Sequence, residues 1–325
     1  MAEKLRWAIL ATGSIARQFA EGLLIAERGE LVAVGSRGLE TAKAFADQFG
    51  GKPYGSYAEA VADPNVDVVY IATPHHTHAD DTIMVASHGK GILCEKPFTL
   101  NAADSARALA AVRAAGIFFM EAFMYRCTPQ THQIRTWLEA GVIGKPVLVQ
   151  SEFAWRADDE WTNFRNQNDL GGGGLMDIGC YCVSFSRMVF GEEPVDGTYI
   201  SQRNEKGVDW IGSGLLRFSK DRSATFSCGM GYTGQNRAVI YGSKGRIEVD
   251  DPWKQRTGSQ LRLFAANEVV SELSLGVSNA ELYAHEADAV ARAFAAGQST
   301  DVPWADTLGQ AQTLDLLKAS AGLRF

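Results

Sequence analysis

The residues best suited to proton chemistry lie in a glycine-rich segment near the middle of the chain. Gly171 to Gly174 are followed by a stretch that predicts the start of a helix and carries Asp177 and Tyr181. Consecutive glycines permit a close backbone approach or unusual dihedral angles. In a helix, Asp177 and Tyr181 are four residues apart and share one face. A carboxylate and a phenol can both exchange protons, but a flexible loop before a core tyrosine gives the same pattern.

A lysine follows the predicted strand Ile92–Cys94, in the sequence Glu95-Lys96-Pro97. Open α/β sheets bind ligands at the carboxyl ends of their strands, which is where this lysine is expected. Pro97 disfavours helical backbone at Lys96, so the lysine is predicted to be extended. Taken alone, Lys-Pro at a strand end is typical of a surface turn.

The segment after the first predicted strand has the layout of the dinucleotide fingerprint G-x-G-x-x-G/A. In that pattern the glycines let backbone amides and a helix N-terminus approach a pyrophosphate. Alanine replaces the first glycine here, and an ordinary tight turn would also fit. The position between a strand and an amphipathic helix favours nucleotide binding. The residues expected to contact the cofactor are Ala11, Thr12, Gly13, Ser14 and Ile15.

A second nucleotide signal follows the second predicted strand, where NAD sites have an Asp or Glu that binds the ribose hydroxyls. This chain has Ser36 and Arg37 there. A guanidinium can hold a 2′-phosphate by paired charged hydrogen bonds, whereas a carboxylate would repel it. We therefore expect NADP rather than NAD, against the alternative that Arg37 is a solvated surface cation.

The elements that must position these groups form two patterns. Up to Ala122, apolar runs alternate with amphipathic helical patterns, which predicts parallel β-α-β units with helices on both sheet faces. Asn101 and Gly116 are typical of the two ends of one such helix. Strands are expected at Trp7–Leu10, Leu31–Val34, Val66–Ala72, Ile92–Cys94 and Ile117–Met120.

After Pro129, strand patterns follow one another without helices between them, which predicts a mostly antiparallel α+β domain. Strands are expected at Pro146–Trp155, Gly197–Arg203, Gly212–Phe218, Ala224–Gly229, Ala238–Tyr241 and Gln260–Ala265, and helices at Ile134–Ala140, Leu282–Ala295 and Thr307–Leu317. The predicted fold class is thus α/β, with two domains. Residues 1–122 are expected to form a doubly wound parallel sheet of the Rossmann type that binds NADP. Residues 123–325 are expected to form an α+β domain with a large mostly antiparallel sheet, for substrate binding and dimerisation.

Composition argues against several other classes of protein. The 325 residues are 46% apolar and 21% charged, as in ordinary globular domains. A net charge of −7 without a basic cluster argues against nucleic acid as a partner. No stretch offers the ~20 apolar residues of a membrane-spanning helix, and the N-terminus fits a strand better than a signal peptide. Five scattered cysteines argue against a disulfide framework, Cys180 and Cys182 are expected to be buried thiols, and the protein is expected to be cytoplasmic.

Together, these motifs resemble the glucose-fructose oxidoreductase / inositol dehydrogenase (Gfo/Idh/MocA) superfamily. The resemblance covers essentially the whole chain: the fingerprint, Ala72-Thr73-Pro74-His75-His76-Thr77-His78, Glu95-Lys96-Pro97, Glu121-Ala122-Phe123-Met124-Tyr125-Arg126 and the glycine-rich segment. The sequence is most similar to the dimeric dihydrodiol dehydrogenases and NADP-dependent D-xylose 1-dehydrogenases. These have a tyrosine where inositol dehydrogenases have histidine, and Tyr181 holds that position.

The resemblance implies roles for individual residues. Lys96 corresponds to the family's active-site lysine, and its bond to Pro97 is often cis in the family. Asp177 corresponds to the carboxylate that orients the substrate, and Tyr181 to the group that gives or takes the proton. The further residues assigned to cofactor binding are Thr73, Pro74, His75, His78, Glu95 and Lys96, with His75 standing where many members have Asn. His75 and His78 could suggest a metal, but no clustered carboxylate or cysteine completes a site, and none is expected.

Oxidation of a hydroxyl requires a proton to leave oxygen while hydride leaves carbon for the nicotinamide. A free tyrosine has a pKa of about 10, and a nearby lysine cation would lower it by favouring the phenolate. We expect Lys96, Asp177 and Tyr181 to meet over the nicotinamide, and leave open whether the lysine or the tyrosine is the base.

The expected substrate is a small sugar, an aldose oxidised at C1. Aromatic and polar residues suit a ring with apolar C–H faces and polar edges, although aromatics also build cores. The residues expected to contact it are Tyr125, Arg126, Trp161, Phe164, Arg165 and Asp177. Alternatives are a reductase of a keto-sugar such as 1,5-anhydrofructose, a dihydrodiol dehydrogenase, an idle NADP-sensing regulator, or a structural dimerisation domain. We also expect a homodimer through an open face of the second sheet, which would otherwise expose a large apolar patch.

Overall fold

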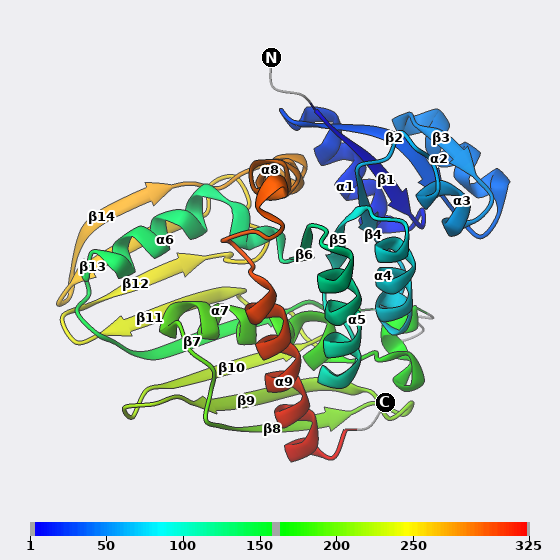
Figure 1. The fold of residues 1–325 in the computed structure, drawn as a ribbon. Coiled ribbons are helices and arrows are strands. Elements are labelled where there is room, and N and C mark those ends of the chain that lie inside the picture. The colour runs from blue at the N-terminus through cyan, green and yellow to red at the C-terminus, as the bar shows by residue number, and fades with distance from the viewer. Residues whose placement is uncertain (1–3, 158–162, 324–325) are drawn as a thin grey trace. The chain divides into compact units, whose positions relative to one another are not determined.

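The computed structural model describes residues 4–157 and 163–323, which form two compact units. The first unit consists of Met1–Thr128 and Ser278–Leu308, and the second of Pro129–Val277 and Gly309–Phe325. The elements of both are labelled in Figure 1. This division differs from the expected one into residues 1–122 and 123–325, because residues 278–308, near the C-terminus, belong to the first unit.

The first unit is built on a six-stranded, all-parallel sheet with the order β3-β2-β1-β4-β5-β6. Its strands are β1 (Leu5–Leu10), β2 (Gly29–Gly35), β3 (Lys52–Tyr54), β4 (Val68–Ile71), β5 (Gly91–Glu95) and β6 (Phe119–Ala122). The order reverses between β1 and β4, as in a doubly wound nucleotide-binding sheet. The predicted Rossmann architecture is confirmed.

The helices of this unit are α1 (Ser14–Ile25), α2 (Leu39–Phe49), α3 (Tyr57–Val61), α4 (His78–Ser87), α5 (Ala102–Ala115) and the returning α8 (Asn279–Ala293). The predicted ends of α5 are confirmed. The Asn101 side chain accepts a hydrogen bond from the Asp104 amide at 2.8 Å, and Gly116 is left-handed with φ of 65°.

Helix α8 packs against α1, and Gly22 is the reason the two helices can come so close. A Cβ atom on Gly22 would lie 2.5 Å from Tyr283 Cβ, 2.8 Å from the Ala284 nitrogen and 2.9 Å from the Ala280 oxygen. The face of α8 that includes Leu282, Tyr283 and Val290 is buried. The C-terminal return therefore completes the core of the first unit.

The second unit is built on an eight-stranded sheet with the order β14-β13-β12-β11-β7-β10-β9-β8. Its strands are β7 (Pro146–Ala154), β8 (Asp196–Arg203), β9 (Asp209–Arg217), β10 (Ser223–Gly229), β11 (Arg237–Gly242), β12 (Gly245–Asp250), β13 (Gln260–Ala265) and β14 (Glu268–Ser274). Only β7 and β10 pair in parallel; the other neighbours are antiparallel, as predicted. The helices are α6 (Pro129–Glu139), α7 (Cys180–Phe190) and the second part of α9 (Trp304–Ala321), and α7 lies over β7 and β10 (Figure 1).

All five cysteines are buried thiols outside any disulfide, which confirms the prediction for Cys180 and Cys182. No helix in the described part of the chain has both the length and the apolar character needed to cross a membrane.

Candidate active site

The turn from β1 into α1 has the backbone of a dinucleotide loop despite its missing first glycine. Ala11 takes a left-handed conformation, with φ of 76°, which glycine ordinarily supplies. Its amide donates to the Gly35 carbonyl at 2.9 Å, which joins the loop to the end of β2. Gly13 caps α1, and nothing lies within 4 Å of where its Cβ would be. The loop is therefore open on the side that a phosphate would approach.

The other predicted cofactor residues on this loop sit at the start of α1. Thr12 precedes Gly13, and Ser14 and Ile15 are the first two residues of the helix. The first turn of α1 contains no acidic side chain. Free amides at a helix N-terminus, without a competing negative charge, suit a bound pyrophosphate.

Ser36 and Arg37 follow β2 at the same edge of the sheet. The Ser36 amide donates to the Tyr54 carbonyl of β3 at 3.2 Å, and the residue is buried. Arg37 is exposed. Its positive charge acts on the neighbouring phenol of Tyr57, although burial dominates and raises the pKa of that tyrosine. The guanidinium is thus at the edge where a ribose substituent is expected.

His78 ties together two loops at the carboxyl ends of β4 and β5. Its Nε2 is 2.7 Å from the Thr73 oxygen, and its Nδ1 is 3.1 Å from the Pro97 oxygen. Burial lowers the pKa of His78. Thr73, Pro74 and the buried His75 belong to the first of these loops. The arrangement assigns His78 a structural role, while direct contact of these residues with the cofactor stays a prediction.

Glu95 and Lys96 come directly at the end of β5 and are both buried. The Lys96–Pro97 peptide is cis, as the family resemblance implied. Glu95 accepts hydrogen bonds from the Lys96 amide at 3.1 Å and from the Tyr70 hydroxyl at 2.5 Å. Burial raises the pKa of Tyr70 well above its ordinary value, so its hydroxyl stays a donor. These contacts fix the backbone from which the lysine side chain extends.

A second buried carboxyl group, Glu286 on α8, accompanies Glu95. Neither of its oxygens has a hydrogen-bond partner among the described residues. Burial, with the negative charge of Glu95, raises the pKa of Glu286 well above its ordinary value. Within the described ranges, no group of three or more His, Cys, Asp or Glu side chains could hold a metal ion.

In the second unit, the structure brings together three residues that were predicted to act on the substrate. Arg165 Nε donates to Asp177 Oδ1 at 2.7 Å, and the guanidinium lies 4.8 Å from the centre of the Phe164 ring. Asn163 steadies this turn by accepting from the Arg165 amide at 3.1 Å. The result is a carboxylate with a charged donor and an aromatic face beside it.

The helical segment that carries Asp177 and Tyr181, the predicted catalytic residues, begins differently from the prediction. Residues Leu175–Gly179 form a single π-helical turn, named η5, which precedes α7. Such turns are rare in proteins, and those that occur are often found at functional sites. Gly173 has φ of 121°, and a Cβ atom on it would overlap Asp209 Oδ1. The Asp177 amide donates to the Gly173 carbonyl at 3.0 Å, so the glycine run sets the position of Asp177.

Tyr181, in the first turn of α7, packs edge-on against two stacked aromatic residues that sequence reasoning missed. The centre of its ring lies 5.2 Å from that of Phe153 and 5.9 Å from that of Trp253. The Trp253 indole donates to the Glu152 carbonyl at 2.8 Å, which fixes the tryptophan in turn. Phe153 lies in the predicted strand Pro146–Trp155, but nothing in the sequence linked it or Trp253 to Tyr181.

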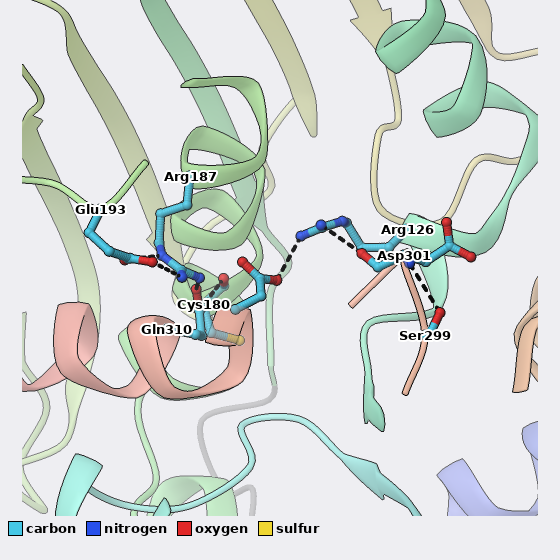
Figure 2. A network of polar contacts seen from close by, with 8 residues as sticks. Arg126, Cys180, Arg187, Glu193, Ser299, Asp301 and Gln310 are labelled. Carbon is cyan, nitrogen blue, oxygen red and sulfur yellow. Dashed lines mark hydrogen bonds and ion pairs between the residues drawn. The ribbon is translucent and has the colours of Figure 1, made fainter. Parts of the chain in front are cut away.

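The preceding residue, Cys180, is held by a polar network on its carbonyl side (Figure 2). Gln310 of α9 donates to the Cys180 carbonyl at 2.8 Å and accepts from Arg187 at 3.0 Å. Arg187 also makes a two-point ion pair with Glu193, at 2.7 and 2.5 Å. This network anchors the start of α7.

The remaining predicted substrate residues have other surroundings. Tyr125 and Arg126 lie in the short turn η2 (Met124–Cys127) of the first unit and are buried. Arg126 binds Asp306 at 3.1 Å and the Asp301 carbonyl at 2.7 Å (Figure 2). Substrate contact by either residue stays a prediction, and Trp161 lies outside the described residues.

Comparison with known proteins identifies both halves of the chain. Residues 5–123 match the profile of an oxidoreductase family with an NAD-binding Rossmann fold, and residues 131–248 match the GFO/IDH/MocA C-terminal domain. A trans-1,2-dihydrobenzene-1,2-diol dehydrogenase from Xenopus tropicalis is 39% identical over 253 residues, which are 76% of each protein.

Two solved structures cover 98% of this chain and 98% of their own. A 3-ketoreductase from Actinomadura kijaniata, in complex with NADP and TDP-benzene, is 26% identical with a TM-score of 0.87. An aldose-aldose oxidoreductase from Caulobacter crescentus, complexed with glycerol, is 25% identical with a TM-score of 0.90.

Proposed function

Because the chain belongs to the GFO/IDH/MocA family of oxidoreductases, we propose that it transfers hydride between NADP and a hydroxyl-bearing carbon of a small sugar. The observation that carries this proposal is that one segment holds both a carboxylate and a phenol in place. Arg165 binds Asp177 at 2.7 Å, and Tyr181 follows four residues later and packs against both Phe153 and Trp253. A chain kept only as a sensor or as a structural dimer would not need these groups.

The residues of the first unit fit a dinucleotide. The amides of the first turn of α1 and the open side of Gly13 would hold the pyrophosphate, and Arg37 would bind the 2′-phosphate of NADP. When bound, the nicotinamide accepts or supplies the hydride. NADP in the crystal structure of the related 3-ketoreductase supports this choice of cofactor.

The protein's own contribution is to position the reacting hydroxyl and to move its proton. Asp177 accepts a hydrogen bond from a substrate hydroxyl, and Tyr181 takes the proton during oxidation or returns it during reduction. Lys96 supplies positive charge that favours the phenolate, since a free tyrosine has a pKa of about 10. Proton transfer by a positioned side chain contributes about 10²- to 10⁴-fold to the rate.

We place substrate recognition in the second unit, where Phe164 offers an apolar face and Arg165 a charged donor. An aldose oxidised at C1 is our leading substrate class. A trans-dihydrodiol is the second candidate, because the curated relative acts on one. Both carry neighbouring hydroxyls on a six-membered ring, so one carboxylate and one guanidinium could bind either.

The test is a substrate panel offered with NADP and, separately, with NAD. Turnover is measured from the absorbance of the reduced nicotinamide. Aldoses, keto-sugars and trans-dihydrodiols are each offered to the purified protein. Turnover should be found with NADP, and Tyr181→Phe and Lys96→Met should each reduce it at least about 100-fold while the Kd for NADP stays nearly constant.

Tyr241→Phe is the matched control, since it removes the same phenolic oxygen from β11 and should leave turnover unchanged. Full activity in Tyr181→Phe would overturn the catalytic assignment. A wild-type protein that binds NADP but turns over no member of the panel would favour the regulator instead.

A further inference from the structure

A buried carboxylate, Asp209, lies beneath the glycine run that leads to Asp177 and Tyr181. It is the first residue of β9 and is fully buried. Its Oδ2 accepts a hydrogen bond from the Leu175 amide at 2.8 Å and another from the Tyr199 hydroxyl at 2.9 Å. Leu175 is the first residue of the π-helical turn. Asp209 therefore caps the helical segment that carries the proposed catalytic pair, from a strand more than thirty positions away.

The second oxygen of Asp209 sets the path of the glycine run. Oδ1 has no hydrogen-bond partner among the described residues and occupies the space where residue 173 would have a side chain. Gly173 in turn donates to the Arg165 carbonyl at 2.9 Å and accepts from the Asp177 amide at 3.0 Å. One glycine thus joins the two members of the Arg165–Asp177 ion pair, and Asp209 fixes that glycine from below.

The groups that face Asp209 decide its charge. Tyr199 of β8 donates to it, and Cys228 of β10 lies 3.4 Å from the same hydroxyl. Burial raises the pKa of both groups, so both stay neutral. The positive charge of Arg203 on β8 lowers the pKa of Asp209.

Burial raises the pKa of Asp209 to about 6, against the lowering effect of three donors (the Leu175 amide, the Tyr199 hydroxyl and its own amide) and of Arg203. The ionised carboxylate can accept both hydrogen bonds on Oδ2. Protonation weakens this arrangement: a proton on Oδ2 displaces one donor, whereas a proton on Oδ1 leaves a buried hydroxyl without an acceptor among the described residues and makes Oδ2 a neutral, weaker acceptor. The cap should therefore loosen as the pH falls through this value.

We propose that Asp209 is a positioning residue for hydride transfer: its ionised carboxylate holds the glycine run and the first helical turn in the arrangement that presents Asp177 and Tyr181. This inference rests on the proposed function. Asp209 acts through the backbone and touches neither substrate nor cofactor.

The test compares the pH dependence of kcat for the wild type, Asp209→Asn and Tyr199→Phe, each loaded with NADP and a substrate found in the panel. The wild type should lose activity on the acid side with a midpoint near 6. Asp209→Asn should be about 10- to 100-fold slower at pH 8, as expected for a misplaced reacting group, and should lack that acid limb. Tyr199→Phe removes a donor that lowers the pKa, so its midpoint should move to higher pH.

Asp221→Asn, the same chemical change on an exposed turn, should match the wild type. The carboxyl carbon signal that Asp209→Asn deletes from the NMR spectrum should titrate near pH 6 in the wild type, independently of activity. An acid limb retained in Asp209→Asn, or a midpoint unmoved in Tyr199→Phe, would overturn the positioning role alone. A wild type without turnover would instead overturn the proposed function, and this inference with it.

Discussion

At the scale of single residues, Arg37 bears on which dinucleotide the protein prefers. The side chain is exposed at the carboxyl end of β2, beside the buried Ser36. We expect Arg37→Asp to lower the NADP/NAD ratio of kcat/KM. The substitution replaces a positively charged hydrogen-bonding partner of the 2′-phosphate with a carboxylate that repels the phosphate. Loss of about 2–3 kcal/mol corresponds to about 30- to 150-fold. Steady-state kinetics with both cofactors measures the ratio.

Lys4→Asp provides the control for this change of charge. Lys4 precedes β1 at the amino end of the sheet, opposite the edge that Arg37 occupies. The ratio should be unaltered in that variant. An unaltered ratio in Arg37→Asp as well would show that the guanidinium is a surface cation without a role in cofactor choice.

Sequence reasoning at this scale succeeds where the interacting residues are close along the chain. Arg165, Asp177 and the glycine run lie within one short segment, and the sequence assigned Arg165 and Asp177 separately to the substrate site, although it did not predict the ion pair that joins them. Asp209 and Trp253 reach the same segment from other strands and turns. An isolated aspartate in the apolar sequence Val208 to Ile211 does predict a buried carboxylate, but pairing of the strands decides what it meets.

At the scale of elements, the close packing of α1 against α8 predicts that a glycine-to-alanine substitution in a helix will destabilise the protein, which is the opposite of its usual effect. Gly→Ala inside a helix ordinarily stabilises by about 0.5–1 kcal/mol. Gly22→Ala should instead destabilise by about 1–3 kcal/mol, because the added methyl meets the backbone of α8 and the helices must separate. The midpoint of urea unfolding should therefore decrease.

Glu21→Ala is the matched comparison, since Glu21 is the exposed neighbour on the same helix. Its effect on the unfolding midpoint should be small, within about 0.5 kcal/mol. A Gly22→Ala variant as stable as the wild type would mean that the two helices do not pack at the distance described.

Elements with a strong local signal were predictable, and short or charged ones were not. The strands β3, β12 and β14 were missed. β3 has three residues and contains Pro53, while β12 and β14 mix charged residues into their alternation. Their strand conformation comes from pairing with β2, β11 and β13 rather than from intrinsic preference. The π-helical turn at Leu175–Gly179 likewise depends on the cap from Asp209, which the local sequence does not contain.

At the scale of the whole molecule, the two-domain organisation followed from the change of pattern near Pro129, but the return of residues 278–308 did not. A helix pattern reveals that a face is apolar without revealing which core it will cover. The apolar face of α8 is completed by Gly22, about 260 positions earlier, a separation over which sequence spacing carries no information.

Helices α7 and α9 cover one face of the eight-stranded sheet. We expect the homodimer to form through the opposite face. Strand register places Ile200 of β8 opposite Ser213 of β9, and side chains two residues apart share a face, so Leu215 lies beside them. Ile200 is 69% and Leu215 48% exposed. Leu148 and Tyr241 extend the same face across β7 and β11. Exposed apolar residues gathered on one sheet face are typical of an association surface.

We expect the wild type to be a dimer at micromolar concentration, and Ile200→Lys combined with Leu215→Lys to be a monomer. A two-fold interface brings the patch of one subunit against the same patch of its partner. Every introduced lysine would therefore be buried near other positive charges. Light scattering gives the mass directly. Val142→Lys changes an exposed apolar residue outside the sheet and should leave the dimer intact. A monomeric wild type would remove the association surface, and a dimer that survives the double substitution would assign the interface to another face.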